Sequence, residues 1–214
     1  MNHLALLPRR RGRPPRDASV PRQDTRELLV RTGVAVLTEK GYSAVGIDEI
    51  LRIAQVPKGS FYHYFDSKEA FGQVLIDAYA SYFAHKLDRW FLGVPVPPLQ
   101  RLRHFIEDAK AGMARHGFRR GCLVGNLGQE MGTLPESFRV QLQMVFRDWQ
   151  SRTAGCLAEA QQAGEIPPQL DCSALAQFFW IGWEGAVLRA KLERSPEALD
   201  VYAQGFFALL SPGP

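Results

Sequence analysis

Cysteine is scarce in this 214-residue sequence, and long apolar runs are missing. The three cysteines, Cys122, Cys156 and Cys172, form no C-x-x-C pair. An odd number without that spacing argues against a disulfide framework and a cysteine zinc site, and free thiols fit a reducing compartment. No apolar run approaches the length of a membrane-spanning helix, and residues 4–7 are too short for a signal sequence. We therefore expect a cytoplasmic protein with no membrane partner, no metal site and no cofactor.

Strand patterns are missing as well, because apolar and polar residues do not alternate with a period of two. Apolar residues recur instead at helical spacing. Asp24 with Glu27, and Asp66 with Glu69, resemble capping pairs that open two of these helices. The sequence predicts an all-α protein with helices over about 25–40, 47–54, 57–65, 68–90, 99–113, 122–131, 136–163, 173–193 and 197–210.

Positive charge is concentrated in residues 1–24, whose six arginines and two aspartates account for the whole net charge of +4. A basic, proline-rich tail of this kind is expected to be disordered and drawn to a polyanion. It contains Arg11-Gly12-Arg13-Pro14, the R-G-R-P core used by AT hooks. We expect Arg11 and Arg13 to enter an A/T-rich minor groove. The alternative is a tail that only aids solubility.

Two short predicted helices lie between Ile47 and Phe65, joined by a tight turn at Gln55-Val56-Pro57. In a helix-turn-helix the first helix braces the second, whose outward face enters the major groove of DNA. The helical spacing turns Phe61 and Phe65 inward. The side chains and backbone amides of the outward face suit phosphate oxygens and base edges. The expected DNA contacts are Lys58, Gly59, Ser60, Tyr62, His63, Tyr64 and Lys68; the alternative for the tyrosines is core packing.

The segment Gly46–Glu69 resembles the DNA-binding signature of the TetR family of repressors. The match spans a helix, the turn, the second helix and the start of the next one. By the family pattern, the seven positions named above would contact DNA. Gly46 departs from the pattern, because the family often has Thr or Ser at this cap. Glycine is an acceptable cap, so we expect only a small loss of stability.

Four glycines and two amides mark the segment 121–132. If the segment is helical, Gly121, Gly125, Gly128 and Gly132 form one bare stripe. Each costs a helix about 1 kcal/mol relative to alanine, so the stripe indicates close helix approach, a broken helix or room for a ligand. Cys122, Asn126 and Gln129 would then share an adjacent face.

A second segment, Phe179–Lys191, places Trp180, Glu184, Val187 and Lys191 on one helix face, with Trp183 beside them. Aromatic walls that hold a carboxylate and an ammonium are typical of a pocket for a small polar ligand. The alternative is a helix at a dimer interface with surface charges.

The motifs G-C-L-x-G-N-L, at residues 121–127, and W-x-G-A-x-L-R-A-K, at residues 183–191, resemble one TetR branch. That branch includes acrylate-responsive repressors and sensors of reactive electrophiles, in which the cysteine and lysine matching Cys122 and Lys191 act together. A nearby ammonium would favour the thiolate. A cation such as Lys191 or Arg120 would also suit a carboxylate. Whether the effector binds reversibly or modifies Cys122 stays open, as does a purely structural, buried Cys122.

These patterns together predict a helix-turn-helix domain over 25–70 and a helical effector-binding and dimerisation domain over 71–214. The last two helices are apolar on more than one face and are the expected homodimer interface. We expect a repressor that binds palindromic operator DNA as a dimer and is released by a small effector; no catalytic residues are expected. The alternatives are an electrophile-scavenging enzyme that uses Cys122 and a sequence-tolerant architectural DNA binder. The expected effector contacts are Arg120, Cys122, Asn126, Trp180, Trp183, Glu184 and Lys191.

Overall fold

The computed structural model describes residues 22–93 and 95–211, and within these ranges the chain forms nine α-helices and no strand. The all-α prediction is confirmed. No helix in these ranges is long and apolar enough to cross a membrane. The helices are α1 (Arg22–Lys40), α2 (Ile47–Ala54), α3 (Lys58–Phe61), α4 (Lys68–Phe91), α5 (Pro98–Ala114), α6 (Leu123–Gln129), α7 (Glu136–Gln162), α8 (Cys172–Glu193) and α9 (Glu197–Leu210).

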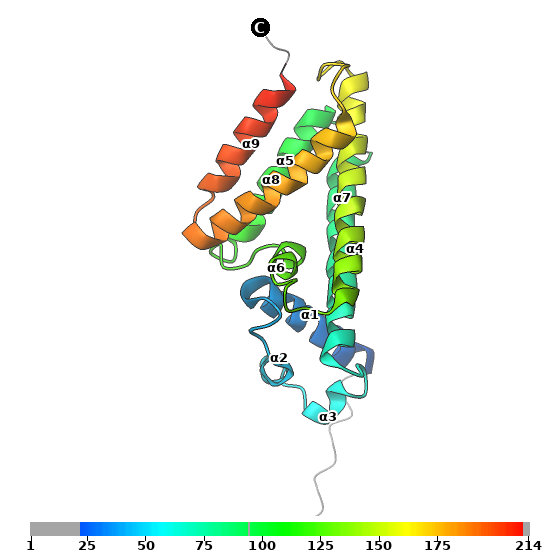
Figure 1. Cartoon of the computed structure of the whole chain (residues 1–214), viewed down its shortest axis with the longest axis vertical. Coiled ribbons are helices and arrows are strands. Elements are labelled where there is room, and N and C mark those ends of the chain that lie inside the picture. The colour runs from blue at the N-terminus through cyan, green and yellow to red at the C-terminus, as the bar shows by residue number, and fades with distance from the viewer. Residues whose placement is uncertain (1–21, 94, 212–214) are drawn as a thin grey trace, which may run out of the picture.

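The long helices α4 and α7 run side by side, and α8 and α9 lie diagonally beside them (Figure 1). Aromatic rings fill the space between α4, α7 and α8. The Trp149 and Trp180 ring centroids are 4.9 Å apart, and those of Phe83 and Trp149 are 4.4 Å apart. Trp149 and Trp180 are almost completely buried. Large buried aromatic rings dominate core energetics, so this cluster fixes how the three helices pack.

The three N-terminal helices gather at one end of the molecule, and α4 leads from them into the rest of the chain (Figure 1). Contacts across this junction are close. The Tyr42 and Phe138 rings meet edge to face with centroids 5.2 Å apart, and a Cβ atom on Gly72 would lie 2.4 Å from Phe138. The predicted domain boundary between residues 70 and 71 falls inside α4, which continues there without a break. The boundary therefore stays a prediction from the sequence.

The start of α1, the cap of α4 and the lengths of α3 and α6 differ from the predicted ones. The helix α1 begins at Arg22, so Asp24 lies in its first turn and is not its cap. Ser67 caps α4 in place of Asp66, since its side chain accepts a hydrogen bond of 3.0 Å from the Ala70 amide. Both predicted capping pairs are therefore wrong. The helices α3 and α6 are also shorter than predicted.

Candidate functional site

The turn between α2 and α3 places the second short helix against the core on one side only. Gln55 ends α2 in the left-handed conformation, with φ at 55°, and Pro57 precedes α3 with an extended backbone. Phe61 is completely buried and contacts Phe71 at the start of α4, with ring centroids 5.2 Å apart. A buried phenylalanine at the end of so short a helix fixes which residues face outward.

The outward face carries the predicted DNA contacts. Lys58, Gly59 and His63 are exposed, and the Tyr62 side chain is 52% exposed. Ser60 and Tyr64 are partly exposed. Phe65, on the inward side, is buried as expected. The geometry thus offers a basic, hydrogen-bonding surface of the kind that contacts a phosphate backbone and base edges.

The two predicted phosphate-binding lysines have protein partners. Lys58 Nζ lies 2.9 Å from Asp48 Oδ1 at the exposed start of α2. A hydrogen bond with Asp48 raises the pKa of Lys58. Lys68 is partly buried, donates a hydrogen bond of 3.0 Å to the Tyr42 carbonyl and sits 4.2 Å from the centre of the Tyr42 ring. Lys68 therefore also holds the loop between α1 and α2 against α4. Arg11 and Arg13 lie outside the described residues.

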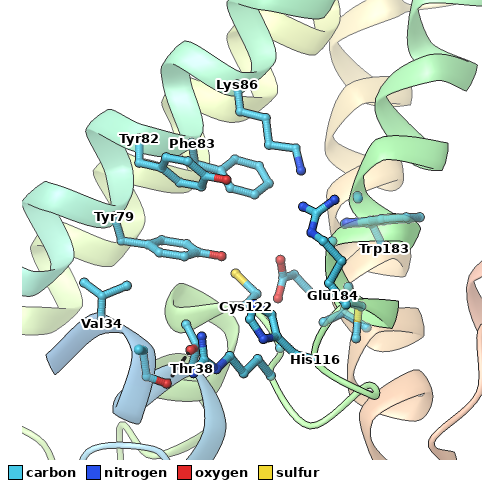
Figure 2. A pocket seen from close by; sticks show the side chains of 18 of the residues that line it. Val34, Thr38, Tyr79, Tyr82, Phe83, Lys86, His116, Cys122, Trp183 and Glu184 are labelled. Carbon is cyan, nitrogen blue, oxygen red and sulfur yellow. Dashed lines mark hydrogen bonds between the residues drawn. The ribbon is translucent and has the colours of Figure 1, made fainter. Parts of the chain in front are cut away.

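A cavity of about 330 Å³ lies between α1, α4, α5 and α8, beside the start of α6 (Figure 2). This volume lies within the range of small-molecule sites. Its walls combine aromatic rings with several cations. The lining residues are Arg31, Val34, Ala35, Thr38, Tyr79, Tyr82, Phe83, Lys86, Ala109, Gly112, Met113, Arg115, His116, Arg120, Gly121, Cys122, Trp183, Glu184 and Val187.

Three side chains form the polar centre of the cavity. Cys122 is the N-cap of α6, where Sγ accepts a hydrogen bond of 3.4 Å from the Gly125 amide. Its thiol also interacts with the Tyr79 hydroxyl and with Glu184, and the three side chains converge in Figure 2. Burial raises the pKa of Glu184 to about 7. Near neutral pH this carboxyl is therefore partly protonated and can donate a hydrogen bond.

The thiol of Cys122 is not activated in this structure. Burial raises the pKa of Cys122 well above its ordinary value, and the charge of Glu184 raises it further. The expected ammonium is elsewhere: Lys191 Nζ lies 3.5 Å from the Thr38 carbonyl oxygen, in a second groove. The expectation that Lys191 favours the thiolate form of Cys122 is wrong for this state of the protein.

The predicted effector residues are divided among three places. Arg120, Cys122, Trp183 and Glu184 line the cavity. Asn126 and Lys191 line the second groove, which is open to solvent between α1, α6 and α8. Trp180 lines neither and lies in the core, where Nε1 donates a hydrogen bond of 3.0 Å to Thr153 Oγ1. Trp180 and Glu184 share a helix face, but one face can meet different neighbours along its length, so Trp180 packs in the core while Glu184 lines the cavity.

The glycines of segment 121–132 do not form a stripe on one helix, because α6 includes only Gly125 and Gly128. Gly125 allows close approach: a Cβ atom there would lie 2.0 Å from Glu184 Oε2. A Cβ atom on Gly121 would contact Val187 and Lys191 at 3.5 and 3.4 Å. Gly125 therefore makes the room that Glu184 occupies.

The helix α4 supplies cavity residues that the sequence analysis missed. Tyr79, Tyr82, Phe83 and Lys86 line the cavity and follow the i, i+3, i+4, i+7 spacing of one helix face. This spacing of three aromatic residues followed by a lysine was the available signal.

The short helix α6 joins the cavity to the helix-turn-helix. Its N-cap residue, Cys122, lines the cavity, and Glu130 follows its last residue. The Glu130 carboxylate accepts hydrogen bonds of 2.9 and 2.7 Å from the amides of Tyr42 and Ser43, in the loop that leads into α2. Asn126 Nδ2 donates to the Leu37 and Thr38 carbonyls at the end of α1. A shift of α6 would therefore act directly on this loop.

An apolar surface remains uncovered on α8 and α9. The large apolar side chains exposed there are Phe178, Ile181, Leu188 and Leu192 on α8, and Val201 and Leu209 on α9. Ile181, Leu192 and Val201 are the most exposed of them. Exposed apolar side chains of this kind are typical of a protein–protein interface.

Known proteins resemble the chain over nearly its whole length. Residues 29–72 match the bacterial regulatory proteins of the tetR family, and residues 98–206 match the tetracyclin repressor-like C-terminal domain. The transcriptional regulator AcuR of Cereibacter sphaeroides is 58% identical over 92% of this chain and 89% of that protein. The transcriptional repressor NemR of Escherichia coli is 32% identical over 83% of this chain and 89% of that protein.

Solved structures agree with these relatives. A crystal structure of regulatory protein TetR from Rhodobacter sphaeroides covers 85% of this chain and 96% of its own, with 58% identity and a TM-score of 0.84. The reduced form of Escherichia coli NemR covers 89% of this chain and all of its own, with 29% identity and a TM-score of 0.81. The resemblance carried by Gly46–Glu69 is confirmed, and this chain belongs to the TetR family of transcriptional regulators.

Proposed function

We propose that this TetR-family repressor acts in the cytoplasm, binds palindromic operator DNA as a homodimer and leaves the DNA when a small effector such as acrylate fills the cavity. The observation that carries the proposal is the position of the cavity. Its walls include Val34 and Thr38 of α1, which packs against α2 of the helix-turn-helix, and Tyr79 of α4, which follows α3. A ligand in this cavity contacts the DNA-binding half of the molecule directly.

Two paths can carry the effect of the ligand to α3. The helix α4 begins beside α3, and Tyr79, the first of its residues that line the cavity, lies about three turns further along the helix. The helix α6 starts at the cavity wall and ends at Glu130, which holds the loop before α2. A ligand that separates α1 from α4 or moves α6 changes the position of α3. Two half-sites lie about 34 Å apart on DNA, so a dimer loses affinity when its two recognition helices leave that spacing.

The chemistry of Cys122 favours reversible binding over covalent modification. A nucleophilic cysteine needs a low pKa, which a nearby cation or helix terminus supplies. Here burial and Glu184 raise the pKa of Cys122. We therefore expect the effector to be a carboxylate that binds reversibly, in preference to an electrophile that modifies Cys122.

A gel shift on the DNA upstream of the protein's own gene tests the proposal. We expect a specific complex with the wild-type protein that acrylate dissociates, and that survives competition by random DNA. The Cys122→Ala variant should respond to acrylate as the wild type does, whereas an N-substituted maleimide should have little effect at neutral pH. Equal affinity for random and operator DNA would instead support an architectural DNA binder.

A second measurement separates a regulator from an enzyme. Because the ligand shifts the equilibrium through its different affinities for the free and DNA-bound states, operator DNA must weaken acrylate binding by the same factor. Calorimetry with and without operator measures this factor. Turnover of acrylate or of a maleimide by the protein, followed by product analysis, would support an enzyme and contradict the proposal.

A further inference from the structure

The cavity has a strong excess of positive charge. Arginine or lysine occupies four lining positions, at Arg31, Lys86, Arg115 and Arg120, whereas Glu184 is the one acidic residue that lines it among the described residues. The pKa of Glu184 is about 7, so its negative charge is incomplete near neutral pH. A cleft lined by charges of one sign favours a ligand of the opposite sign.

Lys86 is the most enclosed of these cations. Its side chain is only 9% exposed, and Figure 2 shows that it extends from α4 into the cavity, toward the space in front of Trp183 and Glu184. A buried ammonium is costly unless it is paired and hydrogen-bonded. The position of Lys86 therefore needs a counter-charge.

Asp108 on α5 supplies part of that counter-charge and is shared. Its Oδ2 atom lies 3.2 Å from Lys86 Nζ and 2.9 Å from an Arg89 guanidinium nitrogen. The same oxygen accepts a hydrogen bond of 3.0 Å from Trp90 Nε1. One carboxylate thus faces two cations. Asp108 holds Lys86 in place but neutralises only one of the two cations, so a net positive charge remains beside the cavity.

A second cation converges on the same point, above Gly112 of α5. A Cβ atom on Gly112 would lie 3.9 Å from Lys86 Nζ and 3.5 Å from Arg115 Nη2. The pKa of Lys86 is lowered, chiefly by burial, and Arg89 and Arg115 lower it further. Glycine at this position leaves open the space that both cations face. The two groups repel each other, and an anion between them would remove that repulsion.

We propose that Lys86 and Arg115 bind the carboxylate of a short carboxylic-acid effector above Gly112, with the rest of the effector among Tyr79, Phe83 and Trp183. The assignment rests on the proposed function, because it names the chemistry that the effector must carry. Two carboxylate oxygens can accept charge-assisted hydrogen bonds from an ammonium and a guanidinium at once. The site differs from the pair Cys122 and Lys191, which the structure does not bring together in one cavity.

Calorimetry on the DNA-free protein tests the assignment with acrylate and propionate, each compared with its neutral amide, acrylamide or propionamide. The amides match the acids in size and shape but carry no charge. We expect the acids to bind and the amides to bind at least about tenfold more weakly, since the amides cannot form the charge-assisted hydrogen bonds. Equal affinity of acid and amide, or no binding of either acid, would overturn the proposal.

Two variants and two controls locate the charge. Lys86→Gln and Arg115→Gln should each weaken binding of the acids at least about tenfold and leave the weak amide binding unchanged. Arg115 is exposed, so its variant should fold even if removal of Lys86 perturbs the packing around Asp108. The matched controls, Lys110→Gln and Arg147→Gln, change residues outside the cavity and should keep wild-type affinity. Wild-type affinity for the acids in both cavity variants would refute the site.

The same variants in a gel shift separate the two proposals. If Lys86 and Arg115 bind acids while the acids fail to release operator DNA, the anion site stands and the proposed effector role fails. If only a neutral electrophile releases the DNA and no acid binds, the regulator stands and the anion site fails.

Discussion

Neighbouring side chains in α3 have opposite roles, which a pair of substitutions can separate. Phe61→Ala removes a completely buried ring and should cost about 3–5 kcal/mol of stability. Tyr62→Ala removes a half-exposed ring, so stability should change by less than about 0.5 kcal/mol, while operator affinity falls by about 1–3 kcal/mol. Denaturant unfolding and a gel shift measure the two effects. Unchanged operator affinity in Tyr62→Ala would contradict the assigned DNA-contact role.

Glu184 makes stability depend on pH. Its pKa is about 7 in the folded protein against an ordinary value of 4.5, so the folded state holds this proton more tightly than the unfolded chain. Its contribution to stability is therefore lost as pH rises from about 4.5 through 7. Glu184→Gln should remove this loss, so the variant gains in Tm relative to wild type between pH 5 and pH 8.

Thermal unfolding at several pH values checks this expectation. The control Glu193→Gln lies on the same helix, but Glu193 is exposed, and its Tm should follow that of the wild type across the range. Parallel Tm curves for the wild type and Glu184→Gln would show that Glu184 titrates alike in the folded and unfolded chain.

Single residues show where prediction from the sequence reaches its limit. Phe61 and Phe65 were predicted to face inward because helical spacing leaves few alternatives in a segment this short, and both are buried. Trp180 and Glu184 share a helix face, but α7 covers the first and the cavity takes the second. Periodicity identifies a helix face and cannot identify its neighbour. Lys86 was missed for the same reason, since its role depends on Asp108 and Gly112 of another helix.

Among the helices, α6 is where cavity and DNA-binding half meet most directly. The variant Glu130→Gln keeps the size of the side chain and weakens the hydrogen bonds to the Tyr42 and Ser43 amides. Hydrogen bonds to a charged group contribute about 1.5–3 kcal/mol, so the loop before α2 should loosen. We expect effector and operator to become less coupled, with the ratio of operator affinities without and with saturating acrylate falling severalfold.

The neighbouring exposed residue provides the control for this experiment. Gln129→Ala alters α6 next to Glu130, and neither its side chain nor its amide takes part in the contacts with the loop at Tyr42 and Ser43. It should leave the affinity ratio unchanged. If Glu130→Gln keeps the wild-type ratio as well, then α4 alone transmits the signal.

Helix positions were more predictable than helix ends. Nine predicted segments correspond to the nine helices in the described residues, since long amphipathic patterns persist whatever surrounds them. The ends depend on local capping, and the residue that caps α4 is Ser67, where the sequence had predicted Asp66. The end of α6 depends on Glu130, whose partners lie 87 and 88 residues earlier in the chain. Such partners cannot be read from the local sequence.

For the molecule as a whole, the apolar surface of α8 and α9 should control assembly. Ile181 and Leu192 are 72% and 74% exposed in the single chain. Placing a charge there, as in Ile181→Asp or Leu192→Asp, would bury an unpaired carboxylate in a dimer. We expect monomers in analytical ultracentrifugation and loss of operator binding. Met144→Asp is the matched control, because Met144 is 63% exposed on α7 and should leave the dimer intact. Dimers in both α8 variants would place the interface elsewhere.

The unbroken α4 limits how this protein can be recombined with its relatives. A chimaera that joins the DNA-reading half of one regulator to the sensing half of another must change sequence within or beside this helix. There Glu69 accepts a hydrogen bond of 2.7 Å from Ser137, and Gly72 has no room for a side chain beside Phe138. A DNA-binding domain taken from a relative therefore needs a glycine at the position opposite Phe138, because a larger residue would clash with that ring. It also needs a hydrogen-bond acceptor for Ser137.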